Sequence, residues 1–379
     1  MSLATEESPE VNMLKQLKLT QFTAFGKATF DFSDGLNVIV GANGTGKTHV
    51  LKLGYLFTRA WSELSKQGVS PEGKRAEAYF EERLMGLFRP ERLAHLARQG
   101  GKATTRLEAN VRGEIPTVKI YMPDEDPPAG IGENLQWEIS IDQDEAKIRT
   151  ARLVNHAARN TILPASLFVP SKEIVSFFDG LISLFENYKI NLDETYRDLA
   201  VAMTVPESQR PSELLPHLLE ALSGSIGGEL VLEKGKLLLR QSNGERLEPQ
   251  LLAEGFRKLG MLLFLVRNHV IETGSNLFWD EPEANLNPEL MRPLIEVLVA
   301  LSGMGVQIVL ATHSLFVLRE IEILLRQPEY QSVPRACFAL APSQQGVKVS
   351  RGTSFEDVDP ILTLDADLAQ SGRFMDVMD

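Results

Sequence analysis

The sequence has little of what marks secreted or membrane-spanning proteins. It contains a single cysteine, Cys337, among 379 residues, so an intramolecular disulfide is excluded and a reducing cytoplasm is the expected compartment. No stretch approaches the roughly 18 uninterrupted apolar residues that a membrane-spanning helix needs. The first residues are acidic and lack the apolar core of a signal peptide. We therefore expect no membrane partner.

Basic residues are also outnumbered. The chain has 39 Lys and Arg against 51 Asp and Glu, a formal net charge of −12. This balance argues against a generally basic surface for nucleic acid. One local cluster is an exception, and it consists of Lys147, Arg149, Arg152, His156 and Arg159. The last four are spaced by three or four residues and would share a helix face, so contact with DNA phosphates is the alternative to a solvated face.

What the sequence does contain is a glycine-rich motif, GANGTGKT, at residues 41–48. Its glycines permit a tight bend that turns backbone N–H groups toward phosphate oxygens. Lys47 would reach the outer phosphates, and Thr48 would place a hydroxyl on Mg²⁺. An apolar strand pattern at 36–40 precedes the motif and a helical pattern follows it, which is the context of a P-loop. The motif supplies six nucleotide-binding candidates: Asn43, Gly44, Thr45, Gly46, Lys47 and Thr48.

Strand and helix patterns alternate in the second half of the chain. The predicted order is helix 256–272, strand 276–279, helix 288–301, strand 306–311 and helix 315–326. Helices of this length between strands imply parallel crossovers, so we predict an α/β fold with a mostly parallel sheet. Earlier patterns predict β-structure at 14–40, strands at 104–111, 117–122 and 136–141, helix at 171–203 and a hairpin at 229–241.

Two acidic residues follow the strand predicted at 276–279. In a doubly wound sheet the carboxyl ends of the strands face the ligand crevice, so Asp280 would complete a Mg²⁺ site opposite Thr48. Glu281 would orient or activate the water that attacks the γ-phosphate. His313 follows the next strand and would contact the same phosphate. For each of these side chains the alternative is a solvated position at a strand end.

A second glycine-containing segment, residues 252–258, lies at the start of the helix predicted after it. Gly255 would stand at the helix N-terminus, where free backbone N–H groups bind anions. This position makes Gly255 a candidate for contact with a phosphate.

These segments together resemble an ABC-type ATPase head of the SMC, RecF and OLD-nuclease-like group, in which a signature segment lies between the P-loop and the acidic strand. The stretch LKLTQFTAFGKATFDFSDGLNVIVGANGTGKT is similar over its whole length to the N-terminal segment of such heads. LFWDEPEANLNP resembles their acidic strand and D-loop, and LATHS resembles their switch-histidine segment. FRPERLAHLARQG and FVPSKEIVSFFDGLISLFENYKINLDETYRDL resemble segments of stand-alone bacterial ATPases of this group.

The resemblance implies a P-loop NTPase of ABC-ATPase head type, with a mixed β-sheet lobe and a helical and mixed insertion. Its cofactors would be ATP and Mg²⁺. A homodimer or higher homo-oligomer would sandwich each ATP between the P-loop of one subunit and Gly255 of another, which acts in trans. The implied catalytic residues are Glu281, His313 and Lys47, and the implied metal ligands are Thr48 and Asp280.

The sequence departs from the pattern of that group in its signature and in its D-loop. Ala253 stands where the group has a serine whose hydroxyl meets the γ-phosphate, which predicts a weaker or slower ATP dimer. Asn285 and Asn287 would lie in the D-loop that crosses the dimer interface, and Asn287 replaces its usual last aspartate.

For the contact with adenine and for the glutamine loop, the sequence offers several candidate residues and no single choice. Phe22 or Phe25 would contact adenine, although each of them suits a core position equally well. Lys172, Glu173 and Gln136 are candidates for the glutamine loop that senses Mg²⁺, and none is favoured over the others.

We divide the chain into an ATPase core, residues 1–60 and 245–379, and a helical and β insertion, residues 61–244. The insertion lacks the heptads of SMC coiled coils, so a long tether between DNA segments is not expected. Asp365 and Asp367 have the spacing of a carboxylate pair. The tail that carries them leaves no room for an OLD-type nuclease module, and we expect it to be a solvated acidic tail.

The expected function is Mg²⁺-dependent ATP hydrolysis coupled to head dimerisation, which would control a separate effector. By analogy, stand-alone heads of this kind pair with a nuclease or toxin in phage defence, which makes antiviral defence the expected setting. Two alternatives stay open. One is a low-turnover, ATP-gated scaffold that holds a partner protein, and the other is a DNA-repair clamp of the RecF kind, for which DNA would be a partner.

Overall fold

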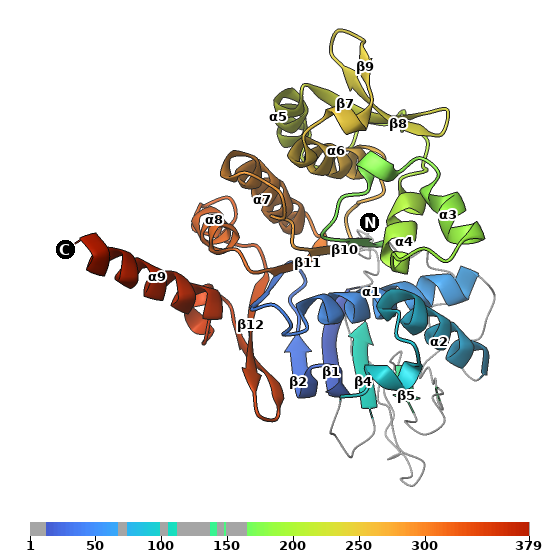
Figure 1. The fold of residues 1–379 in the computed structure, drawn as a ribbon. Coiled ribbons are helices and arrows are strands. Elements are labelled where there is room, and N and C mark those ends of the chain that lie inside the picture. The colour runs from blue at the N-terminus through green and yellow to red at the C-terminus, as the bar shows by residue number, and fades with distance from the viewer. Residues whose placement is uncertain are drawn as a thin grey trace, which may run out of the picture.

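The computed structural model describes residues 13–66, 74–98, 105–111, 137–141, 148 and 165–378, which form three β-sheets with helices around them (Figure 1). The largest sheet has six strands in the order β13-β12-β3-β11-β10-β6. Their bounds are β3 (Leu36–Gly41), β6 (Ser166–Val169), β10 (Asn276–Asp280), β11 (Gln307–Thr312), β12 (Arg335–Ser343) and β13 (Gly346–Gly352). Only β13 runs antiparallel to its neighbour in this sheet. Every residue of β3, β10 and β11 is buried, as the near-continuous apolar runs of a parallel sheet require.

A four-stranded antiparallel sheet, in the order β2-β1-β4-β5, stands beside the first (Figure 1). Its strands are β1 (Leu14–Phe22), β2 (Phe25–Asp31), β4 (Thr105–Val111) and β5 (Trp137–Ile141). Leu17 and Leu19 of β1 are fully buried, whereas Lys18 between them is partly exposed, which confirms the β-structure predicted at 14–40. β13 lies along β2, and the Val347 N–H donates to the carbonyl oxygen of Ala24 at 3.0 Å, so the two sheets meet at this edge.

Helix α1 (Lys47–Lys66) begins inside the P-loop motif and runs between the two sheets (Figure 1). One core cluster surrounds it and includes Leu17 of β1, Leu51 of α1 and Phe278 of β10. Trp279, the next residue of β10, points to the opposite face of the sheet, because successive side chains of a strand alternate. That second core lies under α7 (Pro288–Gly303) and α8 (Leu315–Leu325). The P-loop helix is therefore packed within the first cluster, with β1 on one side and β10 on the other.

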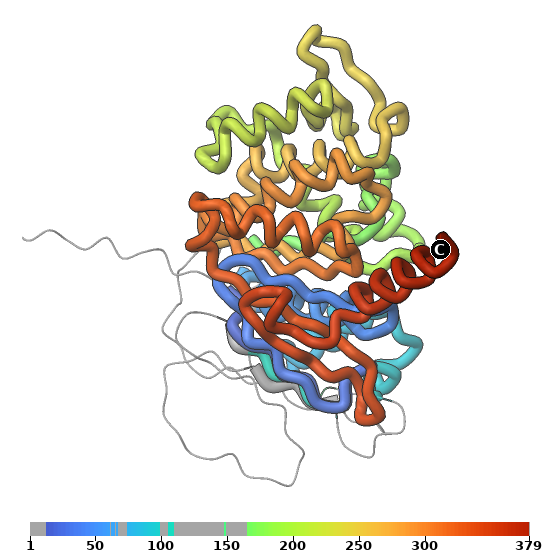
Figure 2. The backbone as a smooth tube through the Cα atoms, turned by 90° about the vertical axis from the view of Figure 1, so that its left-hand side faces the viewer, coloured from blue at the N-terminus to red at the C-terminus, as the bar shows by residue number. Residues whose placement is uncertain are grey.

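The remaining helices and strands surround this centre. They are α2 (Lys74–Phe88), α3 (Leu181–Asn187), α4 (Glu194–Ala202), α5 (Pro216–Ile226), α6 (Glu254–Arg267), α9 (Leu362–Met378), β7 (Gly228–Glu233), β8 (Lys236–Gln241) and β9 (Arg246–Leu247). Short 3-10 turns lie at Leu93–Leu96, Val175–Phe177, Pro249–Leu251 and Phe355–Asp357. Strands β7, β8 and β9 form the third sheet. Figure 2 shows this part of the chain at one end of the molecule and α9 projecting from the molecule's side.

The hairpin predicted at 229–241 is confirmed by β7 and β8. Its turn residues Lys234 and Gly235 have φ angles of 52° and 80°, the combination that suits a two-residue hairpin turn. The strands predicted at 104–111 and 136–141 correspond to β4 and β5, and the strand predicted at 117–122 lies outside the described residues.

Two parts of the chain differ from the prediction. The helix predicted at 171–203 is broken, because Gly180 adopts a φ of 76° before α3 and a turn precedes α4. Asp193 ends that turn by accepting the Thr195 N–H at 2.9 Å, which caps α4. Strands β12 and β13 were not predicted. They place residues beyond α8 in the same sheet as the P-loop strand, ahead of the helix α9 that carries Asp365 and Asp367.

The proposed insertion contributes strands to both large sheets. β4 and β5 extend the sheet that β1 begins, and β6 pairs with β10 at the end of the six-stranded sheet. The division into core and insertion stays a prediction. In the part of the chain that the structure describes, no helix combines the length and the apolar content that crossing a bilayer takes.

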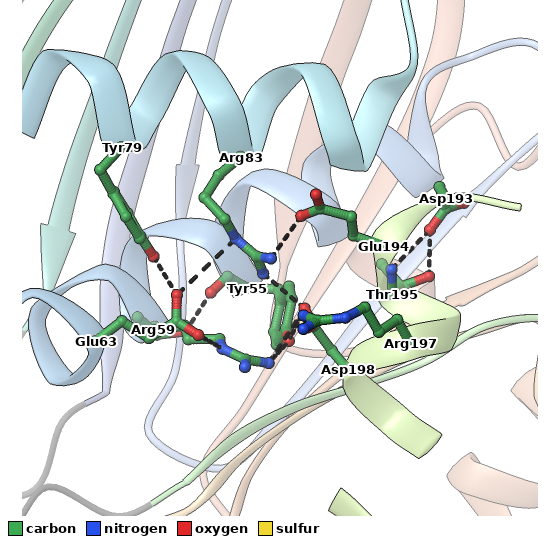
Figure 3. A network of polar contacts seen from close by, with 11 residues as sticks. Tyr55, Arg59, Glu63, Tyr79, Arg83, Asp193, Glu194, Thr195, Arg197 and Asp198 are labelled. Atoms are coloured by element: carbon green, nitrogen blue, oxygen red, sulfur yellow. Dashed lines mark hydrogen bonds and ion pairs between the residues drawn. The ribbon is translucent and has the colours of Figure 1, made fainter. Parts of the chain in front are cut away.

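A buried network of charges joins α1 to α2 and α4 (Figure 3). Arg83 of α2 donates to the carboxylate of Asp198 in α4, with 2.6 Å between Nη2 and Oδ2. The Tyr55 hydroxyl of α1 donates to the same oxygen at 2.8 Å, and Arg59 of α1 adds an ion pair at 3.2 Å. Arg83 and Asp198 are 8% and 4% exposed. The network therefore fixes two outer helices to the P-loop helix in a region that water barely reaches.

Candidate nucleotide-binding and catalytic site

The P-loop leaves β3 at Gly41 and enters α1 at Lys47. Gly44 and Gly46 have φ angles of 80° and 88°, a region that residues with a side chain rarely adopt. A Cβ atom at Gly46 would also stand 2.7 Å from the ring of Phe25. Position 46 therefore requires glycine for two independent reasons, backbone conformation and space.

Asn43 and Thr45 occupy different environments in this loop. Asn43 is exposed, as is Gly44 beside it. Thr45 is 1% exposed, and its hydroxyl donates to the carbonyl oxygen of Ala42 at 2.8 Å. The side chain of Thr45 thus shapes the loop from inside.

Lys47 lies folded into the loop. Its Nζ donates to the carbonyl oxygens of Gly41, at 2.8 Å, and Ala42, at 3.2 Å. Burial lowers the pKa of Lys47, while the nearby carboxylates of Glu281 and Asp280 oppose this shift. The ammonium group therefore has carbonyl partners in this structure that phosphate oxygens would replace.

Thr48 and Asp280 are joined although 232 positions separate them in the chain. The Thr48 hydroxyl donates to Asp280 Oδ2 at 2.8 Å. Burial raises the pKa of Asp280 to about 6, and the hydrogen bond from Thr48 opposes that shift. Among the described residues, the buried Asp280 Oδ1 has no hydrogen-bond partner. A hydroxyl and a carboxylate oxygen with spare acceptor capacity are donors that Mg²⁺ prefers, so these two residues fit the implied metal.

Glu281 and His313 form a second pair, at the carboxyl ends of β10 and β11. β11 lies between β3 and β10, so the P-loop and both strand ends open on one side of the sheet. His313 Nδ1 lies 3.2 Å from Glu281 Oε1, and the imidazole is half exposed. Glu281 has a φ of 49°, an uncommon left-handed conformation for a residue with a side chain, and such strain concentrates at functional sites. The carboxylate of Glu281 thus lies next to His313 at the end of β10.

Gly255 lies at the start of α6, as predicted, and packs against the D-loop of its own chain. A Cβ atom there would stand 2.6 Å from Leu290 and 2.9 Å from Leu286. Asn285 Nδ2 donates to Glu254 Oε1 at 2.9 Å, which joins the signature to the D-loop. These contacts do not bring Gly255 to the P-loop of the same chain, and its action in trans stays a prediction.

The other signature and D-loop candidates have local roles. Ala253 occupies the N-cap position of α6 and makes no side-chain capping bond. Asn287 caps α7, since its side-chain oxygen accepts the Leu290 N–H at 2.9 Å. This capping explains an asparagine at position 287, because Asn and Asp serve equally well as helix N-caps.

The two aromatic candidates for adenine contact belong to the core. Phe22 and Phe25 are both fully buried, so the core alternative holds for each. Their burial follows from the antiparallel pairing of β1 with β2, which turns both rings toward the apolar cluster around α1.

Two of the glutamine-loop candidates, Lys172 and Glu173, differ in burial and in their partners. Lys172 and Glu173 follow β6, whose end adjoins that of β10. Lys172 is exposed, whereas Glu173 is buried and its carboxylate lies 2.7 Å from Arg257 Nε of α6. Glu173 is thus already paired with the signature helix. Gln136 lies outside the described residues.

The basic cluster Lys147, Arg149, Arg152, His156 and Arg159 lies outside the described residues. Asp365 and Asp367 lie on α9, where Asp365 is exposed and Asp367 is 3.4 Å from Arg319 of α8. The carboxylate pair therefore sits on a projecting helix.

Three residues near the site were missed by sequence reasoning. Lys52 stands one helical turn after Thr48 and donates to Asp193 Oδ2 and to the Leu87 carbonyl oxygen, both at 2.8 Å. Lys258 is buried, and its Nζ donates to the Ala284 carbonyl oxygen of the D-loop. The third residue is Glu283, two positions after Glu281. For Lys52 the i, i+4 spacing from Thr48 was the available signal.

The fold and the site define a P-loop ATPase head of the ABC type, and comparison with known proteins supports this class. The chain belongs to the family described as AAA domain, putative AbiEii toxin, Type IV TA system, whose model matches residues 36–319. An SMC head bound to the C-winged helix domain of ScpA is similar in structure, with a TM-score of 0.51, 16% identity, and coverage of 91% of this chain and 98% of that one. The family match and this likeness confirm the predicted fold class.

Two further likenesses are more distant or shorter. The SMC head domain from Thermotoga maritima is similar with a TM-score of 0.46 and 15% identity, covering 89% of this chain and 98% of that one. The DNA replication and repair protein RecF of Renibacterium salmoninarum is 41% identical over 56 residues, 14% of each chain. The match to RecF therefore spans a small part of either protein.

Proposed function

We propose that the chain is a Mg²⁺-dependent ATPase in which two copies close on ATP and thereby control a separate effector protein. The observation that carries the proposal is the hydrogen bond of 2.8 Å between the Thr48 hydroxyl and Asp280, with the Glu281–His313 pair beside it. The P-loop hydroxyl, the metal-binding carboxylate and the candidate base thus meet at one edge of the sheet. This is the arrangement that phosphoryl transfer to water requires.

Each residue has a distinct task in this proposal. Lys47 would exchange its carbonyl partners for the outer phosphate oxygens of ATP. Thr48 and Asp280 would hold Mg²⁺, which when bound neutralises charge on the phosphates. Glu281 would orient the attacking water and accept its proton, and His313 would contact the γ-phosphate.

The proposed dimer rests on the position of the signature. Gly255 packs on Leu286 and Leu290 of its own chain. In the proposal, a second copy brings its signature to the nucleotide. The proposal of an effector partner rests on analogy with other proteins. The similar SMC head is bound to a domain of ScpA, and the family description mentions a toxin. A nuclease or toxin effector in antiviral defence is therefore part of the proposal by analogy.

Replacing the P-loop lysine tests the enzymatic proposal. Lys47→Ala is expected to lower Mg²⁺-dependent ATP turnover at least roughly tenfold, because a charge-assisted contact to the phosphates is lost. Phosphate release measured with and without EDTA checks this, with the exposed Lys74→Ala as the control. A wild-type protein without Mg²⁺-dependent turnover would contradict the assignment as an enzyme.

A second candidate function, a low-turnover scaffold that ATP closes around a partner, is favoured by one observation. The N-cap of α6 is Ala253, which offers no side-chain oxygen to the first turn of the signature helix. A serine there would accept a backbone N–H and, in a closed dimer, face the γ-phosphate. In this candidate function, alanine makes closure of the dimer on ATP weaker or slower, so the protein would hydrolyse ATP slowly.

Ala253→Ser distinguishes the two candidate functions. The added hydroxyl is expected to contribute about 1 kcal/mol, which corresponds to roughly fivefold tighter ATP-dependent dimerisation. Analytical ultracentrifugation in ATP measures the dimer, and the exposed Ala221→Ser on α5 is the control. Turnover that rises with dimerisation favours the enzyme, whereas a tighter dimer with turnover still near zero favours the scaffold. An unchanged dimer would show that Ala253 does not limit closure.

A further inference from the structure

We infer that Glu283 is a positioning residue for His313: its carboxylate fixes the main chain at the end of β11 and receives the imidazole Nδ1–H when Glu281 engages water. The inference rests on the proposed ATPase function and deepens it. Glu283 lies two positions after Glu281, in the segment that leads from β10 to α7.

The carboxylate of Glu283 holds the adjacent strand by two hydrogen bonds. Its Oε1 accepts the Thr312 hydroxyl at 2.5 Å and the His313 backbone N–H at 3.2 Å. Thr312 Oγ1 in turn accepts the Ser314 N–H at 3.0 Å, and Ser314 caps α8. Glu283 therefore sets the bend from which the His313 side chain projects.

The second oxygen of this carboxylate is unsatisfied. Glu283 is 8% exposed, and in the described part of the chain its buried Oε2 has no hydrogen-bond partner. A buried carboxylate oxygen without a donor is rare in folded proteins and calls for an explanation. His313 Nδ1 lies 3.8 Å from Oε1, the other oxygen of the same carboxylate. In the inferred arrangement the imidazole turns from Glu281 toward Glu283, and its Nδ1–H donates to Oε2.

The two carboxylates compete for the same ring nitrogen. In this structure His313 Nδ1 is 3.2 Å from Glu281 Oε1, which occupies an oxygen that catalysis needs for water. Transfer of the Nδ1–H contact to Glu283 frees Glu281 and leaves the other ring nitrogen, Nε2, to face the nucleotide. The hydrogen bond made by one nitrogen of a histidine decides what the other one does. With its Nδ1–H bonded to Glu283, His313 contacts the nucleotide and Glu281 is free to orient water.

Glu283→Gln tests this assignment, since glutamine keeps an oxygen for Thr312 and for the backbone of His313 but has lost an acceptor for the imidazole. We expect kcat to fall about tenfold, as on loss of a group that orients a functional histidine, while KM for ATP stays within about twofold. Glu289→Gln, at an exposed position of α7, is the matched control and is expected to leave both constants unchanged.

A spectroscopic readout separates this inference from the proposed function. We expect ¹⁵N NMR of the wild type and of Glu281→Ala, which lacks the competing acceptor, to show a hydrogen-bonded Nδ1–H of His313 with Mg²⁺ and a non-hydrolysable ATP analogue. Glu283→Gln combined with Glu281→Ala is expected to lose that signal. If the signal persists, the inference is overturned while Mg²⁺-dependent ATP turnover by the wild type still supports the proposed function.

The fold of the variant needs its own check because Glu283 is buried. Thr312→Val removes the hydroxyl that holds Glu283 and is expected to lower kcat, whereas Thr312→Ser keeps the hydroxyl and is expected to restore it. If Thr312→Ser is as slow as Thr312→Val, the hydrogen bond to Glu283 is not what positions His313, and the inference is wrong.

Discussion

Glu281→Gln is expected to lower ATP turnover by about a hundredfold while ATP binding remains intact. A positioned general base typically contributes about this factor or more, and glutamine cannot accept a proton from water. The amide has the shape of the carboxylate it replaces. Its oxygen can still accept the His313 Nδ1–H that lies 3.2 Å from Glu281 Oε1. The substitution therefore removes the base and preserves the geometry around it.

The backbone of the strand end supports this expectation. The Glu281 N–H donates to the Ala311 carbonyl oxygen at 2.8 Å, so the residue is held by the sheet and not by its side chain. Its φ of 49° is likewise a property of the turn after β10 and is compatible with glutamine. We expect no change in folding that would lower turnover indirectly.

A chain that binds ATP and cannot hydrolyse it is expected to accumulate as a dimer. Size-exclusion chromatography with light scattering in Mg²⁺-ATP measures the mass of the protein. The control is Lys47→Ala combined with Glu281→Gln, which is expected to stay monomeric. The trapped dimer is also the form in which an effector would be captured. If both Lys47→Ala and Glu281→Gln hydrolyse ATP at the wild-type rate, the proposed enzymatic function is wrong.

Local patterns sufficed for the elements that carry the nucleotide site. The P-loop glycines, the apolar run before them and the two acids at the end of β10 each report a conformation within about ten residues. The structure places the P-loop and these acids on the same side of the sheet, at the carboxyl ends of β3 and β10. The hairpin of β7 and β8 was predictable for the same reason, because Lys234 and Gly235 favour the turn. The order of the strands required the structure, since β3 pairs with β11 and β12 and with neither of the strands nearest to it in sequence.

Contacts between distant segments were beyond reach of such patterns. Glu173 had suggested a glutamine-loop position, yet it pairs with Arg257, 84 residues later. Phe22 suited an adenine site as well as a core by its chemistry, and only the packing of β1 against α1 decides for the core. Glu283 had no periodic pattern at all, because its partners lie on the neighbouring strand. Pairing in three dimensions determines the role of such residues, and one sequence does not encode it locally.

Arg83→Met is expected to be the most destabilising of the single substitutions considered, because it leaves a carboxylate buried without its main partner. Removing one member of a buried ion pair costs about 3–5 kcal/mol, since the remaining charge has lost its water and its counter-charge. Asp198 is 4% exposed and would keep the Tyr55 hydroxyl at 2.8 Å, Arg59 at 3.2 Å and, at 3.9 Å, the solvent-exposed Arg197 (Figure 3). Urea unfolding followed by circular dichroism measures the loss, with the exposed Arg75→Met on the same helix as control.

The double variant Arg83→Met with Asp198→Asn removes both charges and isolates the reason for that loss. An uncharged amide at position 198 no longer needs a counter-charge, so the double variant is expected to regain more than half of the free energy of unfolding that Arg83→Met loses. Counted over the side chains alone, Arg83 and Asp198 are 10% and 3% exposed, so screening by solvent lowers the expected loss of stability only slightly. If Arg83→Met unfolds within about 0.5 kcal/mol of the Arg75→Met control, the network does not hold α2 and α4 to α1. The P-loop helix would then depend on apolar packing between the two sheets alone, and ATP turnover of Arg83→Met should equal that of the wild type.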